Sequence, residues 1–307
     1  MKVRNSANRT RSSLGDVGEE RLLQRILPAL PSSSAVISGA GDDCAVVRFG
    51  DSKKLLVLKT DCVVERVHFT SDAAPTGVGW KAMARPLSDF AAMAAKPEFA
   101  LVTLIAPAAV STRWVTELYR GLAKAARMFE VAIVGGETSG TDGAMSVSVS
   151  ITGAVAKDRW ISRDGGKAND ELFVTGTLGG SIRGRHLRFI PRIEEAQWLA
   201  QNFRITAMMD LSDGVGADLP RLARASNVGF EVDDAAVPRT RGCSLAEAIS
   251  DGEDYELLFA VAPRDADRMQ TAWRKRFHKL RLTRIGRLVP HSGFRVPSSF
   301  RGYVHFR

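Results

Sequence analysis

Apolar residues recur at two spacings along this chain, and the spacings predict different elements. Met145, Val147, Val149 and Ile151 alternate with small polar residues, which is typical of a half-buried strand. Apolar residues three and four apart predict helices instead, the longest of them opening at a proline. These patterns predict strands at 55–58, 99–106, 131–134, 145–151, 171–175 and 256–261, and helices at 18–27, 75–93, 114–129, 192–201, 215–226 and 265–277.

The apolar periodicity breaks between residues 156 and 170, where Lys, Arg, Asp and Gly take over. Strands and helices mix on both sides of this break without strict alternation. This favours an α/β domain followed by an α+β domain over one doubly wound sheet. We therefore expect a flexible basic N-terminus (1–14), an N-terminal domain (15–156) and a C-terminal α+β domain (157–307).

Composition narrows the class of protein. The 307 residues are 45% hydrophobic and 25% charged, and no apolar run reaches the roughly 18 residues of a membrane span. The first 13 residues are basic but lead into no apolar segment, which argues against a secretory signal and leaves a transit peptide as the alternative to a frayed terminus. Three cysteines without a CxxC pair favour a reducing cytoplasm.

The net charge of +9 is concentrated at the C-terminal end. Residues 264–307 hold twelve Lys or Arg against two Asp, so the rest of the chain is nearly neutral. A basic face of this kind can dock RNA or attract anionic substrates. No aromatic-interleaved or helix-turn-helix pattern accompanies it, so a solvated face is the favoured interpretation and nucleic acid is not expected as a partner.

Carboxylates on turns are the chemically informative feature. Asp210 and Asp213 are three apart in Asp-Leu-Ser-Asp-Gly, between an apolar run and a predicted helix. Both can face one solvent pocket, where the helix N-terminus would favour a phosphate. Oxygen-only sites suit Mg²⁺, which substrate phosphates commonly complete. The alternative is that Ser212 or Asp213 only caps the helix.

Three further aspartates also stand in turns or beside apolar runs. Asp43 stands in Gly-Asp-Asp, Asp61 follows Thr60 at a predicted strand end, and Asp89 lies inside an apolar helix. A buried unpaired carboxylate is costly, so Asp89 needs a partner. A metal ion and a salt bridge to Arg85 are both open.

Other candidates are weak when they stand alone. Gly136 and Glu137 follow an apolar strand and could present backbone N–H groups to phosphate, but Gly-Gly turns are common. His68 is a lone histidine, which is usually structural. Glu253 lies in an acidic turn before a predicted strand, and an exposed turn is the favoured interpretation when this motif stands alone.

Taken in order, these motifs resemble the thiamine-monophosphate kinase family. The resemblance rests on Gly-Asp-Asp-Cys-Ala (41–45), Thr-Asp (60–61), His-Phe (68–69), Leu-Ser-Asp-Phe-Ala-Ala-Met (87–93), Gly-Gly-Glu-Thr (135–138), Asp-Leu-Ser-Asp-Gly (210–214), Gly-Glu-Asp-Tyr-Glu-Leu (252–257) and Gly-Tyr-Val-His-Phe (302–306). The superfamily also includes aminoimidazole ribonucleotide synthetase, selenophosphate synthetase and a hydrogenase-maturation dehydratase. The Leu-Ser-Asp-Gly turn after Asp210 points to the kinase branch.

The resemblance implies an N-terminal α/β domain whose mixed sheet forms a homodimer interface, followed by an α+β domain. It also implies transfer of the ATP γ-phosphoryl group to thiamine monophosphate with several Mg²⁺ ions. By this resemblance the metal ligands are Asp43, Thr60, Asp61, Asp89, Glu137, Asp210 and Asp213. ATP would be contacted by Gly136, Glu137, Arg163 and Ser212, and thiamine monophosphate by His68, Glu253 and Tyr303.

The chain departs from the family pattern at four places. Glu137 replaces the usual Asp, and Lys59 stands before Thr60 where a small hydroxyl residue is commoner. The segment after Arg163 lacks a Pro-Gly, and a helical stretch is missing near Gly184. Two rival functions therefore stay open: another ATP-dependent synthetase of this superfamily, and a catalytically degenerate nucleotide- or RNA-binding protein. The kinase is the favoured interpretation.

Overall fold

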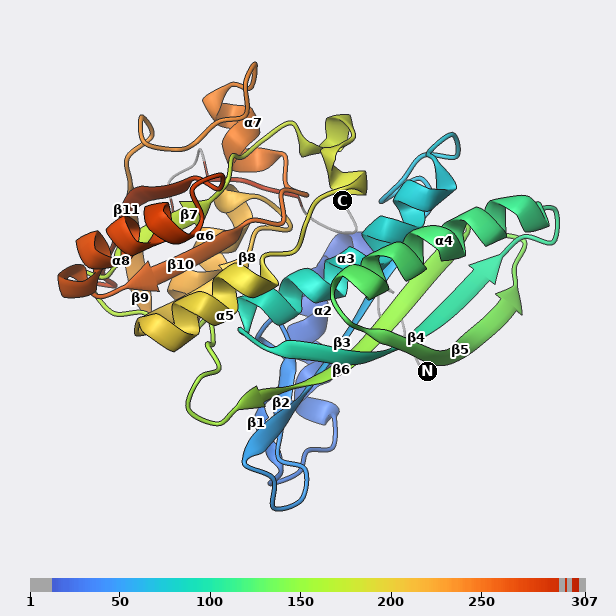
Figure 1. Cartoon of the computed structure of the whole chain (residues 1–307), viewed down its shortest axis with the longest axis horizontal. Coiled ribbons are helices and arrows are strands. Elements are labelled where there is room, and N and C mark those ends of the chain that lie inside the picture. The colour runs from blue at the N-terminus through green and yellow to red at the C-terminus, as the bar shows by residue number, and fades with distance from the viewer. Residues whose placement is uncertain (1–12, 293–295, 297–299, 304–307) are drawn as a thin grey trace, which may run out of the picture.

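A computed structural model describes residues 13–292, 296 and 300–303 of the chain (Figure 1). The predicted flexible N-terminus is described only from residue 13 onward. Residues 304–306 of the terminal motif lie outside the described part. No helix in the described ranges combines the length and the apolar character that crossing a membrane requires.

The first sheet is mixed, as the sequence predicted. Its six strands are ordered β1-β2-β3-β6-β4-β5, and all neighbours are antiparallel except the parallel pair β4–β5. The strands are β1 (Val36–Ser38), β2 (Ala45–Val47), β3 (Lys54–Val64), β4 (Lys96–Ala106), β5 (Ala132–Gly140) and β6 (Ser146–Ala156).

Two long helices, α3 (Pro75–Ala92) and α4 (Thr112–Met128), cover one face of this sheet (Figure 1). Their backbones touch at a reciprocal pair of glycines. A Cβ on Gly79 would lie 2.0 Å from the Leu118 carbonyl oxygen, and a Cβ on Gly121 would lie 2.0 Å from the Thr76 carbonyl oxygen. Only glycine at both positions permits this approach, and it fixes α3 against α4.

The second sheet has five strands in the order β8-β10-β7-β11-β9, all antiparallel. Its elements are β7 (Glu171–Thr175), α5 (Ile193–Asn202), β8 (Ile205–Asp210), α6 (Val215–Ala225), β9 (Val228–Val232), α7 (Leu245–Ser250), β10 (Leu257–Val261), α8 (Pro263–Arg276) and β11 (Leu282–Pro290). The described residues outside both sheets add α1 (Leu14–Val17), α2 (Glu19–Ile26) and the 3-10 turns η1 (Leu27–Ala29), η2 (Ser181–Arg183) and η3 (Arg185–Leu187).

Helix α3 joins the two halves of the molecule. It packs on β3 and β6 of the first sheet and on β8 and α5 of the second half. Phe173 and Phe259 of the second sheet share one apolar core with the first sheet, while the opposite face of the second sheet packs under α6. The indole of Trp80 donates a 2.7 Å hydrogen bond to the Phe189 carbonyl, which ties α3 to the second half.

The local predictions held best for long periodic segments. The five predicted helices from 75–93 onward and the predicted strands are all confirmed, although β3 and β5 run on through polar residues to Val64 and Gly140. The first predicted helix (18–27) corresponds to α2, which begins after Gly18. A short helix, α1, precedes it and was not predicted; Ser13 caps α1, and Gly18, with a φ of 71°, separates the two helices.

Candidate active site

Three buried carboxylates meet where the two sheets adjoin. Asp43 lies in the loop before β2, Asp89 near the C-terminal end of α3, and Asp210 at the end of β8. Each offers an oxygen within 4.8 Å of the others, and each residue is less than a tenth exposed. Carboxylates this close repel one another in a low-dielectric interior, so the fold gathers them at an energetic cost.

The local sequence explains why these three residues converge. Asp210 ends β8, opposite Leu257 of β10, and the chain then turns through 211–214 into α6. The apolar positions of α3 pack it against β8, so its residues Ser88 and Asp89 arrive beside Asp210. The Ser88 hydroxyl hydrogen-bonds to Asp210. The cluster is therefore a product of tertiary packing.

Basic side chains surround the cluster. The Lys59 ammonium is 2.7 Å from Asp89 Oδ1, so the partner of Asp89 within the chain is Lys59. The predicted alternative, Arg85, lies 3.8 Å from Asp61 instead and donates to the Cys62 carbonyl. Arg163 forms an ion pair with Asp43. A salt bridge to Arg85 was thus the wrong pairing for Asp89, although the need for a partner was correct.

The clustering changes proton affinities. Burial, reinforced by the charge of Asp43, raises the pKa of Asp210 to about 7. Asp61 behaves differently: burial opposes its ionisation, but Lys59 and Arg85 outweigh burial and its pKa lies below the usual value. The pKa of Asp210 is raised because burial and the charge of Asp43 outweigh the stabilisation of its ionised form by Ser88 and Lys59.

The donor set fits a hard divalent cation. Asp43 Oδ2 is buried and has no hydrogen-bond partner among the described residues. Such an atom is costly unless something binds it. The cluster offers only carboxylate oxygens at its centre, which are the ligands that Mg²⁺ prefers. Asp43, Asp89 and Asp210 would hold such an ion.

The raised pKa of Asp210 gives metal binding a pH dependence. A cation and a proton compete for this carboxylate, so the apparent Mn²⁺ affinity should fall about tenfold per pH unit below about pH 7 and level off above it. Mn²⁺ titrations from about pH 5.5 to about pH 8.5 measure this profile. The Asp210→Asn variant should lose the inflection. An inflection unchanged in that variant would assign it to another group.

Asp213 lies outside the three-carboxylate cluster. Arg221 of α6 holds it at 2.5 Å and also pairs with Asp218 at 2.8 Å. The backbone N–H of Asp213 donates to Asp218, which fixes the turn before α6. Asp213 and Ser212 both line the adjoining pocket, so the turn faces solvent as the sequence predicted.

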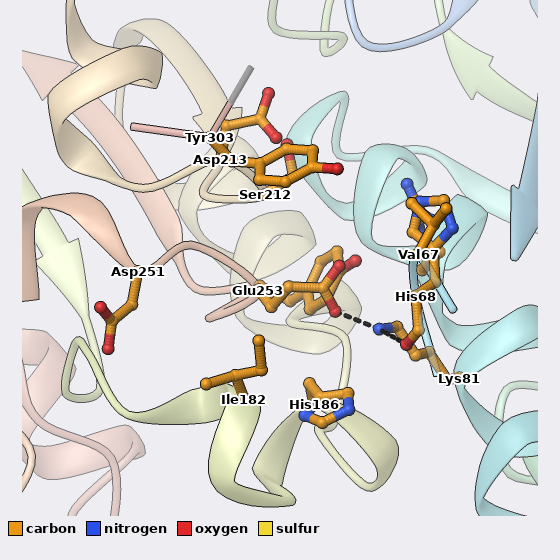
Figure 2. Close-up of a pocket in the computed structure, with 12 residues that line it drawn as sticks. Val67, His68, Lys81, Ile182, His186, Ser212, Asp213, Asp251, Glu253 and Tyr303 are labelled. Atoms are coloured by element: carbon orange, nitrogen blue, oxygen red, sulfur yellow. Dashed lines mark hydrogen bonds and ion pairs between the residues drawn. The ribbon is translucent and has the colours of Figure 1, made fainter. Parts of the chain in front are cut away.

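A pocket opens beside the cluster, between α3 and the loops of the second half (Figure 2). All three predicted thiamine-contacting residues, His68, Glu253 and Tyr303, line it. Figure 2 shows Glu253 reaching across the pocket to Lys81, with which it forms an ion pair. Lys81 is fully buried and also donates to the His68 carbonyl at 2.6 Å.

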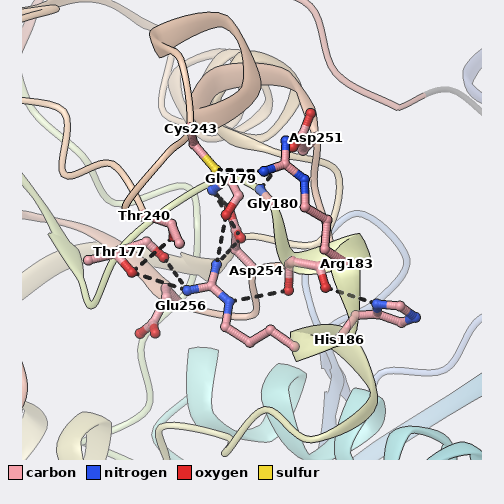
Figure 3. Close-up of polar contacts among 12 residues, drawn as sticks. Thr177, Gly179, Gly180, Arg183, His186, Thr240, Cys243, Asp251, Asp254 and Glu256 are labelled. Carbon is pink, nitrogen blue, oxygen red and sulfur yellow. Dashed lines mark hydrogen bonds and ion pairs between the residues drawn. The ribbon is translucent and has the colours of Figure 1, made fainter.

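The loop that carries Glu253 is held from behind by ion pairs (Figure 3). Arg185 pairs with Asp254, which also accepts the Gly179 N–H at 2.9 Å, and Arg192 pairs with Glu256. Glu253 itself has a φ of 57°, in the left-handed region that few side chains adopt. The network fixes this strained loop so that Glu253 points into the pocket.

Thr60, Gly136 and Glu137 lie apart from the cluster. Successive residues of a strand point to opposite faces, so the Thr60 hydroxyl, which accepts from Ser150 at 3.0 Å, faces away from Asp61. Glu137 shares that outer face through its register with Thr103, Ser148 and Cys62. Its strand β5 is three strand spacings from β3, about 14 Å. A single chain therefore does not bring these residues to Asp43.

The basic C-terminal segment is partly ion-paired. Ion pairs join Arg264 and Arg268 to Asp265, Arg284 to Asp267 and Glu171, Arg276 to Glu194, and Arg287 to Glu231. These arginines lie on α8 and β11, and all but the half-buried Arg284 are exposed. The acidic partners lower the net positive charge of this face.

Sequence reasoning missed several site residues. Lys81, Ile182 and His186 line the pocket, and Arg221 holds the 211–214 turn. Lys81 lies inside a helix whose residues are almost all buried, and no acidic residue is near it in the sequence. A charged residue in such a place indicates a buried lysine whose partner lies on another segment. Ile182 and His186 carry no local signal, because only the packing of η3 beside α3 and of η2 beside η3 places them. Arg221 lies on α6, three residues after its partner Asp218.

The chain matches two family descriptions in tandem: "AIR synthase related protein, N-terminal domain" over residues 41–155 and "AIR synthase related protein, C-terminal domain" over residues 131–297. The thiamine-monophosphate kinase of Rhodopirellula baltica is 40% identical over 296 residues, which cover 88% of this chain and 92% of that protein. The chain belongs to the thiamine-monophosphate kinase family. The Escherichia coli K12 member is 34% identical, with 80% of this chain and 82% of that protein covered.

Solved structures of the thiamine-monophosphate kinase family share the fold. One described as AaThiL complexed with AMPPCP and TMP has a TM-score of 0.82 at 30% identity, covering 96% of this chain and 99% of that one. The enzyme of Stenotrophomonas maltophilia K279a has a TM-score of 0.71 at 30% identity, with 88% and 93% covered. The Escherichia coli hydrogenase maturation protein HypE, at 19% identity and a TM-score of 0.65 with 88% and 92% covered, shares the fold alone.

Proposed function

We propose that this protein phosphorylates thiamine monophosphate with ATP and magnesium, giving thiamine diphosphate and ADP. The observation that carries the proposal is a buried carboxylate cluster beside a pocket lined by His68, Glu253 and Tyr303. The chain has this site within a sequence that aligns along nearly its whole length with thiamine-monophosphate kinases. The structure described as holding AMPPCP and TMP supports ATP and the monophosphate as the two substrates.

The reaction brings two polyanions together, so its barrier is largely electrostatic and orientational. Bound magnesium ions would neutralise the facing phosphates and align them. Asp43, Asp89 and Asp210 would hold such ions, and Asp61 and Asp213 flank them from β3 and the turn before α6. The acceptor phosphate is already anionic, so we assign no general base.

The phosphates of ATP have two candidate contacts near the cluster. Arg163 already pairs with Asp43, and Ser212 lines the pocket next to Asp213. We propose that Arg163 turns its free donors to a phosphate and that the 211–214 turn presents backbone N–H groups to it. The proposed roles of Thr60, Gly136 and Glu137 require a second chain, because those residues lie on the far face or far edge of the first sheet.

That second chain is proposed to be another copy of the protein. The sheet face opposite α3 and α4 exposes Phe99 and Leu101 of β4, and Val134 is exposed on β5. Exposed apolar residues gathered on one face are typical of an association surface. We propose a homodimer formed through this face, with Thr60 and Glu137 at or near the interface. Light scattering of Leu101→Glu should report a monomer if this is correct.

Glu253 is proposed to recognise the cationic thiazolium ring. Replacing it by glutamine keeps a hydrogen-bond acceptor for Lys81 but removes the charge. Opposite unit charges about 4 Å apart attract by about 4 kcal/mol near a protein surface, so the KM for thiamine monophosphate should rise about tenfold or more. The KM for ATP should stay nearly unchanged. Glu231→Gln, which changes an exposed residue of β9, is the matched control. An equal loss for both substrates would indicate a structural role.

The proposal is tested by incubating purified protein with ATP, Mg²⁺ and thiamine monophosphate. Thiamine diphosphate should form only with both substrates and should disappear with EDTA. ATP binding without any diphosphate product would contradict the proposal and favour a synthetase of the superfamily. The three cysteines are free, and we propose a reducing compartment, the cytoplasm, as the site of this reaction.

A further inference from the structure

The carboxylates around the proposed metal site outnumber the basic side chains that contact them. Within the described residues, five carboxylates gather here: Asp42, Asp43, Asp61, Asp89 and Asp210. Three basic side chains contact them: Lys59, Arg85 and Arg163. The adjoining pair of Glu253 and Lys81 is balanced by itself. The cluster therefore carries two unmatched negative charges when all its groups are ionised, which one divalent cation neutralises.

Lys59 differs from the two arginines in its position. Strand β3 points Lys59 and Asp61 to the same face, toward α3, and the Lys59 side chain is only 22% exposed. Its ammonium forms an ion pair with Asp89 Oδ1 at 2.7 Å, and Asp89 is one of the three clustered carboxylates. An ammonium is a compact point charge with three donors. At this position it neutralises the charge of Asp89, as a small cation would.

We propose that Lys59 is a resident cation of this site, which replaces one divalent ion, so that the nucleotide-free protein binds a single divalent ion per chain. That ion binds between Asp43 and Asp210, because Asp43 Oδ2 is buried and has no hydrogen-bond partner among the described residues. Asp89 contributes less to it, because one of its oxygens pairs with Lys59. Removing the lysine charge opens the Asp61–Asp89 side of the cluster to a second ion. The inference rests on the metal site proposed above and not on the identity of the phosphoryl acceptor.

Counting Mn²⁺ tests this directly. Purified protein is titrated with Mn²⁺ alone, and free Mn²⁺ is measured by electron paramagnetic resonance. Wild type should bind one tight ion per chain, and Lys59→Met should bind two. Lys59→Arg, which keeps the charge, should stay at one. Lys54→Met changes an exposed lysine at the start of the same strand and should also stay at one.

Thermal unfolding adds a readout that does not depend on activity. In EDTA, Lys59→Met should melt below wild type, because Asp89 loses its partner, and Mg²⁺ should raise its melting temperature more than that of wild type. If the methionine variant does not fold, Lys59→Gln, which keeps a donor, replaces it. If wild type and the neutral variants all bind one ion, the inference is overturned, but the proposed kinase function is unaffected. No ion in any of them overturns the metal site as well.

Discussion

Replacing Asp210 by asparagine is expected to lower turnover about 10³-fold or more while the protein stays folded. Asparagine has nearly the shape of aspartate, so the buried position opposite Leu257 remains filled. The change removes one charge from a cluster in which three carboxylate oxygens lie within 4.8 Å. The expected loss follows because that charge would hold a metal ion between the two phosphate groups.

The same substitution should not destabilise the metal-free protein. Burial raises the pKa of Asp210 to about 7, so the folded state binds more protons than the unfolded state between about pH 4 and about pH 7. Stability therefore falls as the pH rises through this window, and the ionised carboxylate is unfavourable above it. Asparagine removes that cost, so in EDTA at alkaline pH the variant should melt at or above the wild-type temperature.

Steady-state turnover and thermal unfolding, both with and without Mg²⁺, check these two expectations together. Asp267→Asn is a matched control, because Asp267 is a highly exposed residue of α8 that pairs with Arg284. It should leave turnover unchanged. Near wild-type activity in Asp210→Asn would contradict the assigned role, whereas a large loss of stability in EDTA would show that the carboxylate is structural.

Replacing Gly121 by alanine is expected to cost about 3 kcal/mol of unfolding free energy or more. The new Cβ would lie 2.0 Å from the Thr76 carbonyl oxygen, and a backbone atom cannot move aside without shifting the whole of α3. Because α3 also carries Lys81 and Asp89, turnover should fall with stability. Urea denaturation measures the first effect and the kinase assay the second.

Gly140→Ala is the control for this pair of helices. Gly140 ends β5, and a Cβ there would meet no atom within 4 Å. It should change stability by less than about 1 kcal/mol. If Gly121→Ala unfolds at the same urea concentration as wild type, the contact between α3 and α4 is looser than the reciprocal glycines indicate.

Sequence reasoning was strongest where chemistry and local pattern coincide. Asp43, Asp89 and Asp210 each stood out as a carboxylate in an apolar or turn setting, and the structure brings all three together. His68, Glu253 and Tyr303, taken from the family resemblance, share one pocket. Long amphipathic segments such as α4 also needed no tertiary information, because one face repeats regularly.

The missed features depend on contacts between distant segments. β1 and β2 are only three residues each, too short to show a period. They are strands because β1 pairs with β2 and β2 pairs with β3. Arg85 was expected beside Asp89 because it lies one helical turn away. Instead, Lys59 of β3, thirty positions earlier in the sequence, pairs with Asp89. Thr60 faces away from Asp61 because of strand alternation, which the motif alone does not reveal.

The most direct test of the central claim is transfer of label from ATP. ATP labelled with heavy oxygen in its γ-phosphoryl group is incubated with the protein, Mg²⁺ and thiamine monophosphate, and the products are weighed by mass spectrometry. Direct transfer predicts that the label appears in the terminal phosphate of thiamine diphosphate, with one ADP formed for each. Label found only in inorganic phosphate, with thiamine monophosphate unchanged, would contradict the kinase assignment.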